Sequence, residues 1–259
     1  MDRFEKWYKD SKPLMRELWR MAQPDEDGSG WTHKRGDGYH VAEVRPRDLV
    51  LVKRPHRGVD LEEPNWVNAS FAWWRDYPRN QVVYPTSMLV YDGKLLNNVQ
   101  PNGFWTGEHA GRGVPTPTFI IYKDGRVALR TVNDLRSEAS AIHLAVTVVQ
   151  TNPNISQQGY VPYVSWSSIA YRANRVGIFY RGRDDRALLI FSPDCNIERL
   201  HQIARDEGAD LGGSLDSGGS ANYRLAGVPI NATHRLMAAG ITWFGPLLNE
   251  ISGIDLCDI

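Results

Sequence analysis

Short runs of β-branched, aliphatic and aromatic residues, separated by polar turns, recur between residues 49 and 191 and most restrict the fold of this chain. The runs predicted as strands are 49–52, 88–91, 119–122, 127–132, 161–166, 176–180 and 187–191. Two connections carry an Asp-Gly pair, Asp92-Gly93 and Asp124-Gly125. This dipeptide favours tight hairpins because both residues tolerate positive φ. The sheet is therefore expected to be at least partly antiparallel.

The segment after residue 194 has the pattern of an amphipathic helix. Its apolar stripe consists of Ile197, Leu200, Ile203 and Ala204. Either Asp194 or Asn196 can cap its start, and Gly208 supplies a stop. A strand is predicted on each side of this helix. We therefore predict an α+β fold, with mixed, largely antiparallel sheet and a few packed helices in a single main domain.

The chain divides by composition into an N-terminal region, residues 1–38, and a main domain, residues 39–259. Apolar residues between Phe4 and Trp19 follow helical spacing and predict an amphipathic arm, which Pro13 splits. Residues 23–38 are rich in glycine and charge and are predicted to be a linker. The two cysteines, Cys195 and Cys257, are too few for a disulfide framework or a zinc site.

Composition excludes several classes of protein. The 259 residues include 30 Lys+Arg and 30 Asp+Glu, so binding of nucleic acid by bulk positive charge is excluded. No run of 18 or more apolar residues is present, which excludes a membrane-spanning helix. The first twenty residues lack the features of a signal peptide, so a cytoplasmic protein is expected, with a phage-borne or otherwise exported one as the alternative.

The run Leu215–Ser220, Leu-Asp-Ser-Gly-Gly-Ser, is the strongest candidate for a functional site. Its glycines let a ligand approach the main chain, and its amides can bind phosphate or carboxylate oxygens. No Gly-Lys-Ser/Thr and no helix pattern follows, so the common nucleotide-binding loops do not fit. A tight turn between strands is the alternative interpretation.

Several motifs, in a consistent order over roughly residues 60–245, resemble the phosphodiester glycosidase family. They are Asn68-Ala69-Ser70-Phe71, the hairpin 119–127, Arg175-Val176-Gly177-Ile178, Leu215–Ser220 and Arg235-Leu236-Met237. The sequence departs from the family pattern at Ser217 and Ala69, each of which replaces a glycine. Both are small residues, so the backbone geometry survives if these positions do not need positive φ.

The resemblance implies a hydrolase that cleaves the C1–O bond of a sugar or ribose phosphodiester and leaves a phosphomonoester. It implies Asp216 as the catalytic carboxylate, with Arg175 and Arg235 binding and neutralising the phosphate. The residues expected to contact substrate are Asn68, Phe71, Ser217, Gly218, Gly219 and Ser220. The substrate class is a sugar phosphodiester or a nucleotide-sugar-like molecule, small or polymeric.

Two other functions are left open by the sequence. A binding module that captures a phosphorylated sugar or nucleotide without turnover is the first alternative, motivated by Ser217 and Ala69. The second is an assembly protein that forms oligomers through its N-terminal arm. Cofactors and metals are not expected because the seven histidines lack ligand spacing, although Ca²⁺ on scattered carboxylates stays open.

Three further features are weaker candidates. The segment 103–113, which holds Trp105, Glu108, His109 and Arg112, fits either a loop over a pocket or a surface excursion. The aromatic segment 65–77 fits either a wall for a sugar ring or packing against the sheet. Cys195 is predicted to be a buried apolar residue rather than a nucleophile.

Overall fold

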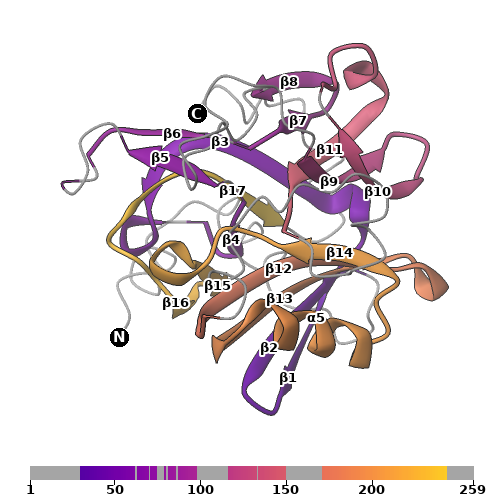
Figure 1. Ribbon diagram of the computed structural model, residues 1–259. Helices are drawn as coiled ribbons and strands as arrows, with labels where there is room; N and C mark the ends of the chain where they lie inside the picture. The colour runs from indigo at the N-terminus through magenta and orange to yellow at the C-terminus, as the bar shows by residue number, and fades with distance from the viewer. Residues whose placement is uncertain are drawn as a thin grey trace, which may run out of the picture.

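The computed structural model describes residues 30–61, 63–69, 71–74, 79, 81–85, 87–97, 116–132, 134–149 and 171–243. The described part consists of three five-stranded sheets, a two-stranded ribbon, five short 3₁₀ turns and one α-helix (Figure 1). All strand pairs in it are antiparallel.

The first sheet has the strand order β1–β2–β13–β12–β14. Its strands are β1 (Thr32–Gly36), β2 (Tyr39–Val44), β12 (Ala173–Arg181), β13 (Arg186–Cys195) and β14 (Leu211–Ser214). The second sheet has the order β10–β9–β11–β7–β8. Its strands are β7 (Leu89–Tyr91), β8 (Lys94–Asn97), β9 (Thr116–Tyr122), β10 (Val127–Val132) and β11 (Ile142–Thr147).

The third sheet has the order β16–β15–β4–β17–β3. Its strands are β3 (Leu49–Arg57), β4 (Trp66–Asn68), β15 (Tyr223–Leu225), β16 (Val228–Asn231) and β17 (Leu236–Trp243), and the ribbon pairs β5 (Ala72–Trp74) with β6 (Val83–Pro85). The helix is α5 (Ile197–Asp206), and the 3₁₀ turns are η1 (Pro46–Asp48), η2 (Gly58–Asp60), η3 (Ala139–Ala141), η4 (Gly182–Asp184) and η5 (Gly218–Ser220).

One apolar core is shared by the three sheets. Fully buried side chains from each of them, such as Val176, Phe119 and Ile241, belong to one continuous cluster. The opposite face of the first sheet packs against α5, through residues such as Ile190 and Leu200, as Figure 1 shows beneath β12 and β13. Side chains alternate along the strands of the first sheet, so those on one face join the shared core and those on the other face contact α5.

The predicted α+β class is wrong, because the described part is an antiparallel β fold with one α-helix. The sequence pattern located this helix correctly, and Asn196 rather than Asp194 is its N-cap, accepting a hydrogen bond from the Arg199 amide at 2.8 Å. The further packed helices that the α+β class requires are absent from the described residues. Short connections between antiparallel strands leave little chain for helices.

Most of the predicted strands are present and both Asp-Gly turns form hairpins. The pairs β7–β8 and β9–β10 enclose Asp92-Gly93 and Asp124-Gly125. The strand β1 lies inside the stretch predicted as a linker, because its residues are polar and form a sheet edge. The N-terminal arm and the predicted strand 161–166 lie outside the described residues. No helix in the described part is long and apolar enough to cross a membrane.

The glycine at position 212 is required where β14 pairs with β12. Gly212 has φ of +138°, and a Cβ there would collide with the Ile178 carbonyl oxygen and the Phe179 backbone. We expect Gly212→Ala to lower the free energy of unfolding by about 3 kcal/mol, measured by urea denaturation. Gly38→Ala is the control, since Gly38 also has positive φ but open space beyond its Cα. It should cost only about 1 kcal/mol. Equal losses would contradict the backbone collision.

Candidate functional site

The predicted site residues converge where the first and third sheets meet. Asp216 lies two residues beyond β14, and Arg175 lies near the start of β12 in the same sheet. Arg235 directly precedes β17 of the third sheet, and Asn68 ends β4. Strand ends from two sheets thus gather polar side chains at one edge of the shared core.

The Asp216 side chain is buried and is surrounded by hydrogen-bond donors and cations. Burial raises the pKa of its carboxyl group to about 7, although the Ser220 hydroxyl, the Ser217 amide, Arg235 and Arg175 all act to lower it. The Ser217 amide donates to Oδ1 at 2.9 Å. A carboxyl group with this pKa exists in both protonation states near neutral pH, as acid–base catalysis requires.

The backbone at Ser217 does not need a glycine. Ser217 has φ of −138° and ψ of −170°, an extended conformation open to any residue. Its hydroxyl donates to the Leu215 carbonyl at 2.9 Å. Gly218, in contrast, has φ of +67°, which favours glycine. Ala69 is also outside the positive-φ region. The two departures from the family pattern are therefore compatible with the backbone.

The Arg235 guanidinium lies over the Gly219 main chain. A Cβ on Gly219 would lie 3.2 Å from Cζ of Arg235, so any side chain there would displace the guanidinium. Nη1 of Arg235 donates to the Ser220 hydroxyl at 3.4 Å, and that hydroxyl in turn donates to Asp216. Gly219 is exposed and Arg235 is half-buried, so this corner of the site is open to solvent.

Arg175 is buried and is held by backbone carbonyls. Its Nη2 donates to the Tyr171 carbonyl at 2.5 Å and its Nε to the Cys195 carbonyl at 3.3 Å. Burial lowers the pKa of its guanidinium, whereas Cys195 and Asp216 raise it. Arg175 therefore contributes a fixed positive charge beside Asp216, while Arg235 contributes a more accessible one.

Asn68 braces the backbone of the site. Its Nδ2 donates to the Asp216 main-chain carbonyl at 2.5 Å, and its Oδ1 accepts from the Asn222 amide at 2.7 Å. Phe71 packs in a small apolar cluster with Val149 and Ile197, near the start of α5. The structure thus brings Asp216, both arginines and the glycine run together, whereas the Asn68 side chain bonds main-chain groups of Asp216 and Asn222.

Two residues of the site were not predicted. Asn222 and Thr233 connect Asn68 to the glycine run and to Arg235 by hydrogen bonds. Both lie in short polar stretches beside strands, where asparagine and threonine commonly form turns. The one signal in the sequence is their position close to the glycine run and to Arg235.

Two of the weaker candidates, Asp194 and Cys195, lie within the described residues. Asp194 has φ of +41° and forms an exposed ion pair with Arg172 at 2.9 Å. Burial raises the pKa of the Cys195 thiol, which disfavours the reactive thiolate. The segment 103–113 lies outside the described residues, as do Tyr77 and the side chains of Trp73 and Trp74. Within the described ranges, no three His, Cys, Asp or Glu side chains gather closely enough to hold a metal ion.

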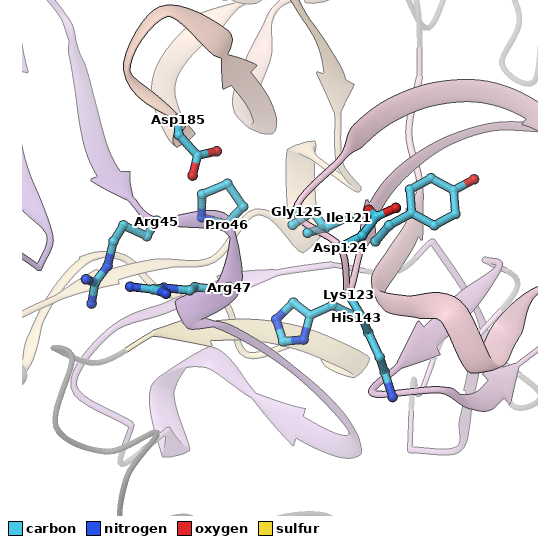
Figure 2. Close-up of a pocket in the computed structure, with 10 residues that line it drawn as sticks. Arg45, Pro46, Arg47, Ile121, Lys123, Asp124, Gly125, His143 and Asp185 are labelled. Atoms are coloured by element: carbon cyan, nitrogen blue, oxygen red, sulfur yellow. The ribbon is translucent and has the colours of Figure 1, made fainter.

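A cavity of about 550 Å³ lies at the other end of β12, between η1 and the β9–β10 turn. Figure 2 shows Pro46 and Asp185 facing the Gly125 turn across it, with the His143 ring between Arg47 and Lys123. It contains none of the predicted site residues, and about 20 Å of strand separates it from Arg175.

The charges that line this cavity are largely compensated. Arg45 pairs with Asp48 at 2.7 Å, and Lys123 pairs with Asp92 at 2.9 Å. Asp124 is held by Arg126 at 3.0 Å. Together with the exposed Arg47, the lining holds three basic side chains against Asp124 and Asp185, a formal charge of about +1.

Comparison with known proteins supports the fold. No protein-family model matches the sequence, and no curated protein matches it significantly. Among solved structures, the catalytic domain of zebrafish N-acetylglucosamine-1-phosphodiester alpha-N-acetylglucosaminidase is similar, with a TM-score of 0.58 and 15% identity over 86% of each chain. A putative exported protein from Burkholderia pseudomallei is similar with a TM-score of 0.51 and 12% identity, over 80% of this chain and 74% of that one. At such identities the likeness shows a shared fold.

Proposed function

We propose that this chain is a hydrolase that cleaves the glycosidic C1–O bond of a sugar or ribose phosphodiester and releases a phosphomonoester. The observation that carries the proposal is the Asp216 carboxyl group, buried beside Arg175 and Arg235, with a pKa of about 7. The zebrafish N-acetylglucosamine-1-phosphodiester alpha-N-acetylglucosaminidase, whose catalytic domain has a similar fold, supports the same reaction class.

The surroundings of Asp216 match the demands of this reaction. Cleavage of the C1–O bond builds positive charge at C1. A carboxylate can stabilise this charge, attack C1 as a nucleophile, or activate a water molecule that attacks C1. The departing phosphomonoester gains negative charge, which a guanidinium binds through two parallel hydrogen bonds. In this proposal Arg235, at the open corner, binds the phosphate, and Asp216 acts at C1.

The binding-module alternative rests on the two replaced glycines. Ser217 is extended, and Ala69 lies outside the positive-φ region, so neither replacement distorts the turn. The backbone therefore gives no reason to prefer the binding module over the hydrolase.

The direct test is incubation of the protein with a panel of sugar-1-phosphodiesters and nucleotide sugars, followed by phosphorus NMR and mass spectrometry. The proposal requires new phosphomonoester together with free sugar. A compound that protects the protein against heat without being cleaved would instead support the binding module.

The pH dependence of kcat/KM provides a second test. The carboxyl group must be ionised to act at C1, and its pKa is about 7. We therefore expect kcat/KM to rise about 100-fold from pH 5 and to level off near pH 8. Ser220→Ala should move the inflection to higher pH, because the hydroxyl hydrogen bond lowers the pKa of Asp216. A rate that falls through pH 7 would assign Asp216 the role of a general acid.

A further inference from the structure

The Thr233 hydroxyl joins the glycine run to the start of β17. Its Oγ1 donates to the Gly219 carbonyl at 2.7 Å and accepts from the Arg235 amide at 3.1 Å. A threonine hydroxyl has one hydrogen and two lone pairs, so it serves both partners at once. One side chain therefore fixes the main chain of Gly219 relative to the main chain of Arg235.

Thr233 is itself held in place by hydrogen bonds of its main chain. Its amide donates to Oδ1 of Asn222 at 3.0 Å, and its carbonyl accepts from the Val59 amide at 3.3 Å. Asn222 continues the connection, since its own amide donates to Asn68, which holds the main chain of Asp216. The main chain of Thr233 is thus fixed on both sides, although it lies in the connection between β16 and β17.

The position of Gly219 determines how Arg235 and Ser220 face the carboxyl group. The guanidinium lies directly over Gly219 and donates to the Ser220 hydroxyl, which donates to Asp216. Movement of the Gly219 carbonyl would shift both groups relative to Asp216. The Ser217 amide would still donate to Oδ1 of Asp216, because that hydrogen bond does not involve Gly219.

We propose that Thr233 is a positioning residue that sets the distance between the phosphate-binding Arg235 and the Asp216–Ser220 pair. This inference rests on the proposed function. The hydroxyl contacts no reacting group, and it acts by keeping the cation and the carboxyl group at the two ends of one C1–O–P unit. Displacements of about 1 Å in such an arrangement cost about 100-fold in rate.

The test compares two substitutions of Thr233. Thr233→Val removes both hydrogen bonds and keeps the side-chain volume, so kcat for phosphomonoester release should fall about 30- to 100-fold, with a smaller change in KM. Thr233→Ser keeps the hydroxyl and should stay within about threefold of the unmodified protein. The conservative variant therefore separates the hydroxyl from the rest of the side chain.

Thr242→Val is the matched control. Thr242 Oγ1 donates to the Asn65 carbonyl at 2.7 Å, the same bond length as in Thr233, at the far end of β17. This variant should lose stability and keep kcat. Unchanged kcat in Thr233→Val, or an equal loss in both valine variants, would overturn the positioning role.

Hydrogen exchange of residues 215–222 gives a readout that does not depend on turnover. Thr233→Val should accelerate exchange in this peptide, whereas Thr233→Ser and Thr242→Val should not. If the unmodified protein cleaves no compound, the proposed function fails, and the exchange result still decides whether Thr233 holds the turn. Unchanged exchange in Thr233→Val would overturn the inference by itself.

Discussion

Replacing Asp216 with asparagine is expected to abolish phosphomonoester release and, at pH 8, to stabilise the protein. Loss of the carboxylate removes the group proposed to act at C1, so kcat should fall at least about 1,000-fold. The stability gain follows from burial, which raises the pKa of the carboxyl group from 3.8 to about 7. Asparagine has the same shape and carries no charge to be desolvated.

The sign and size of the gain follow from proton binding. Between pH 3.8 and 7 the folded state holds a proton that the unfolded state has lost, so stability falls as the pH rises through this range. At pH 8 ionised Asp216 costs about 4 kcal/mol, and at pH 5 about 1.5 kcal/mol. Calorimetry should therefore show a larger rise in Tm for Asp216→Asn at pH 8 than at pH 5.

Asp194→Asn is the control for both effects. Asp194 is exposed, and its hydrogen bond with Arg172 lowers the pKa of its carboxyl group, so this substitution should bring no gain at pH 8. Full activity is expected because Asp194 forms its ion pair at the surface. Loss of activity in Asp194→Asn would identify a second catalytic carboxylate. A folded Asp216→Asn protein with normal turnover would disprove the role assigned to Asp216.

Two buried histidines are expected to destabilise the protein as the pH falls, against the opposite contribution of Asp216. Burial lowers the pKa of His56 and of His201 to about 4. The Nε2 atoms of both rings are buried without a hydrogen-bond partner, and the rings pack edge-on against Trp66 and Phe179. A backbone hydrogen bond, with Arg54 for His56 and with Val149 for His201, raises the pKa of each ring, but the effect of burial is larger.

The unfolded state binds these protons below pH 6.5 and the folded state does not, so stability falls as the pH drops from 6.5 to 4. At pH 4.5 each histidine should contribute a loss of about 2.5 kcal/mol relative to pH 7.5. Urea denaturation at the two pH values should show a smaller loss for the double variant His56→Gln, His201→Gln. The exposed His234→Gln is the control, and an equal acid sensitivity in all three proteins would contradict the assignment.

Local features of this fold could be predicted from the sequence, whereas its class could not. The hairpin 119–132 and the helix capped by Asn196 are encoded by nearby residues, through turn chemistry and apolar spacing. The strand β1 is polar throughout because it is a sheet edge, so its sequence resembles a linker. Because such strands are not recognised in the sequence, the one clear helix led to a prediction of more helices than the described part contains.

In the candidate site, too, local features could be predicted from the sequence and long-range contacts could not. The run Leu215–Ser220 was singled out by its glycines and its carboxylate, and the role of Asp216 was predicted from the resemblance to the phosphodiester glycosidase family. The brace formed by Asn68, Asn222 and Thr233 was not predicted as such, since its hydrogen bonds join residues 154 and 11 positions apart in the chain. Contacts of this kind depend on the sheet arrangement, which periodicity does not specify.

The arrangement of the third sheet has a consequence for how the chain acquires its structure during synthesis. β17 lies between β4 and β3, with Trp243 opposite Leu49 and Thr242 opposite Trp66. At about 5–20 residues per second, a ribosome needs roughly 10–35 s to add the residues that separate these partners. Closing so long a loop is also entropically costly and slow. Throughout that interval, β3 and β4 leave the ribosome with unpaired apolar edges, and a nascent chain stalled before residue 236 would present both to chaperones or to other chains.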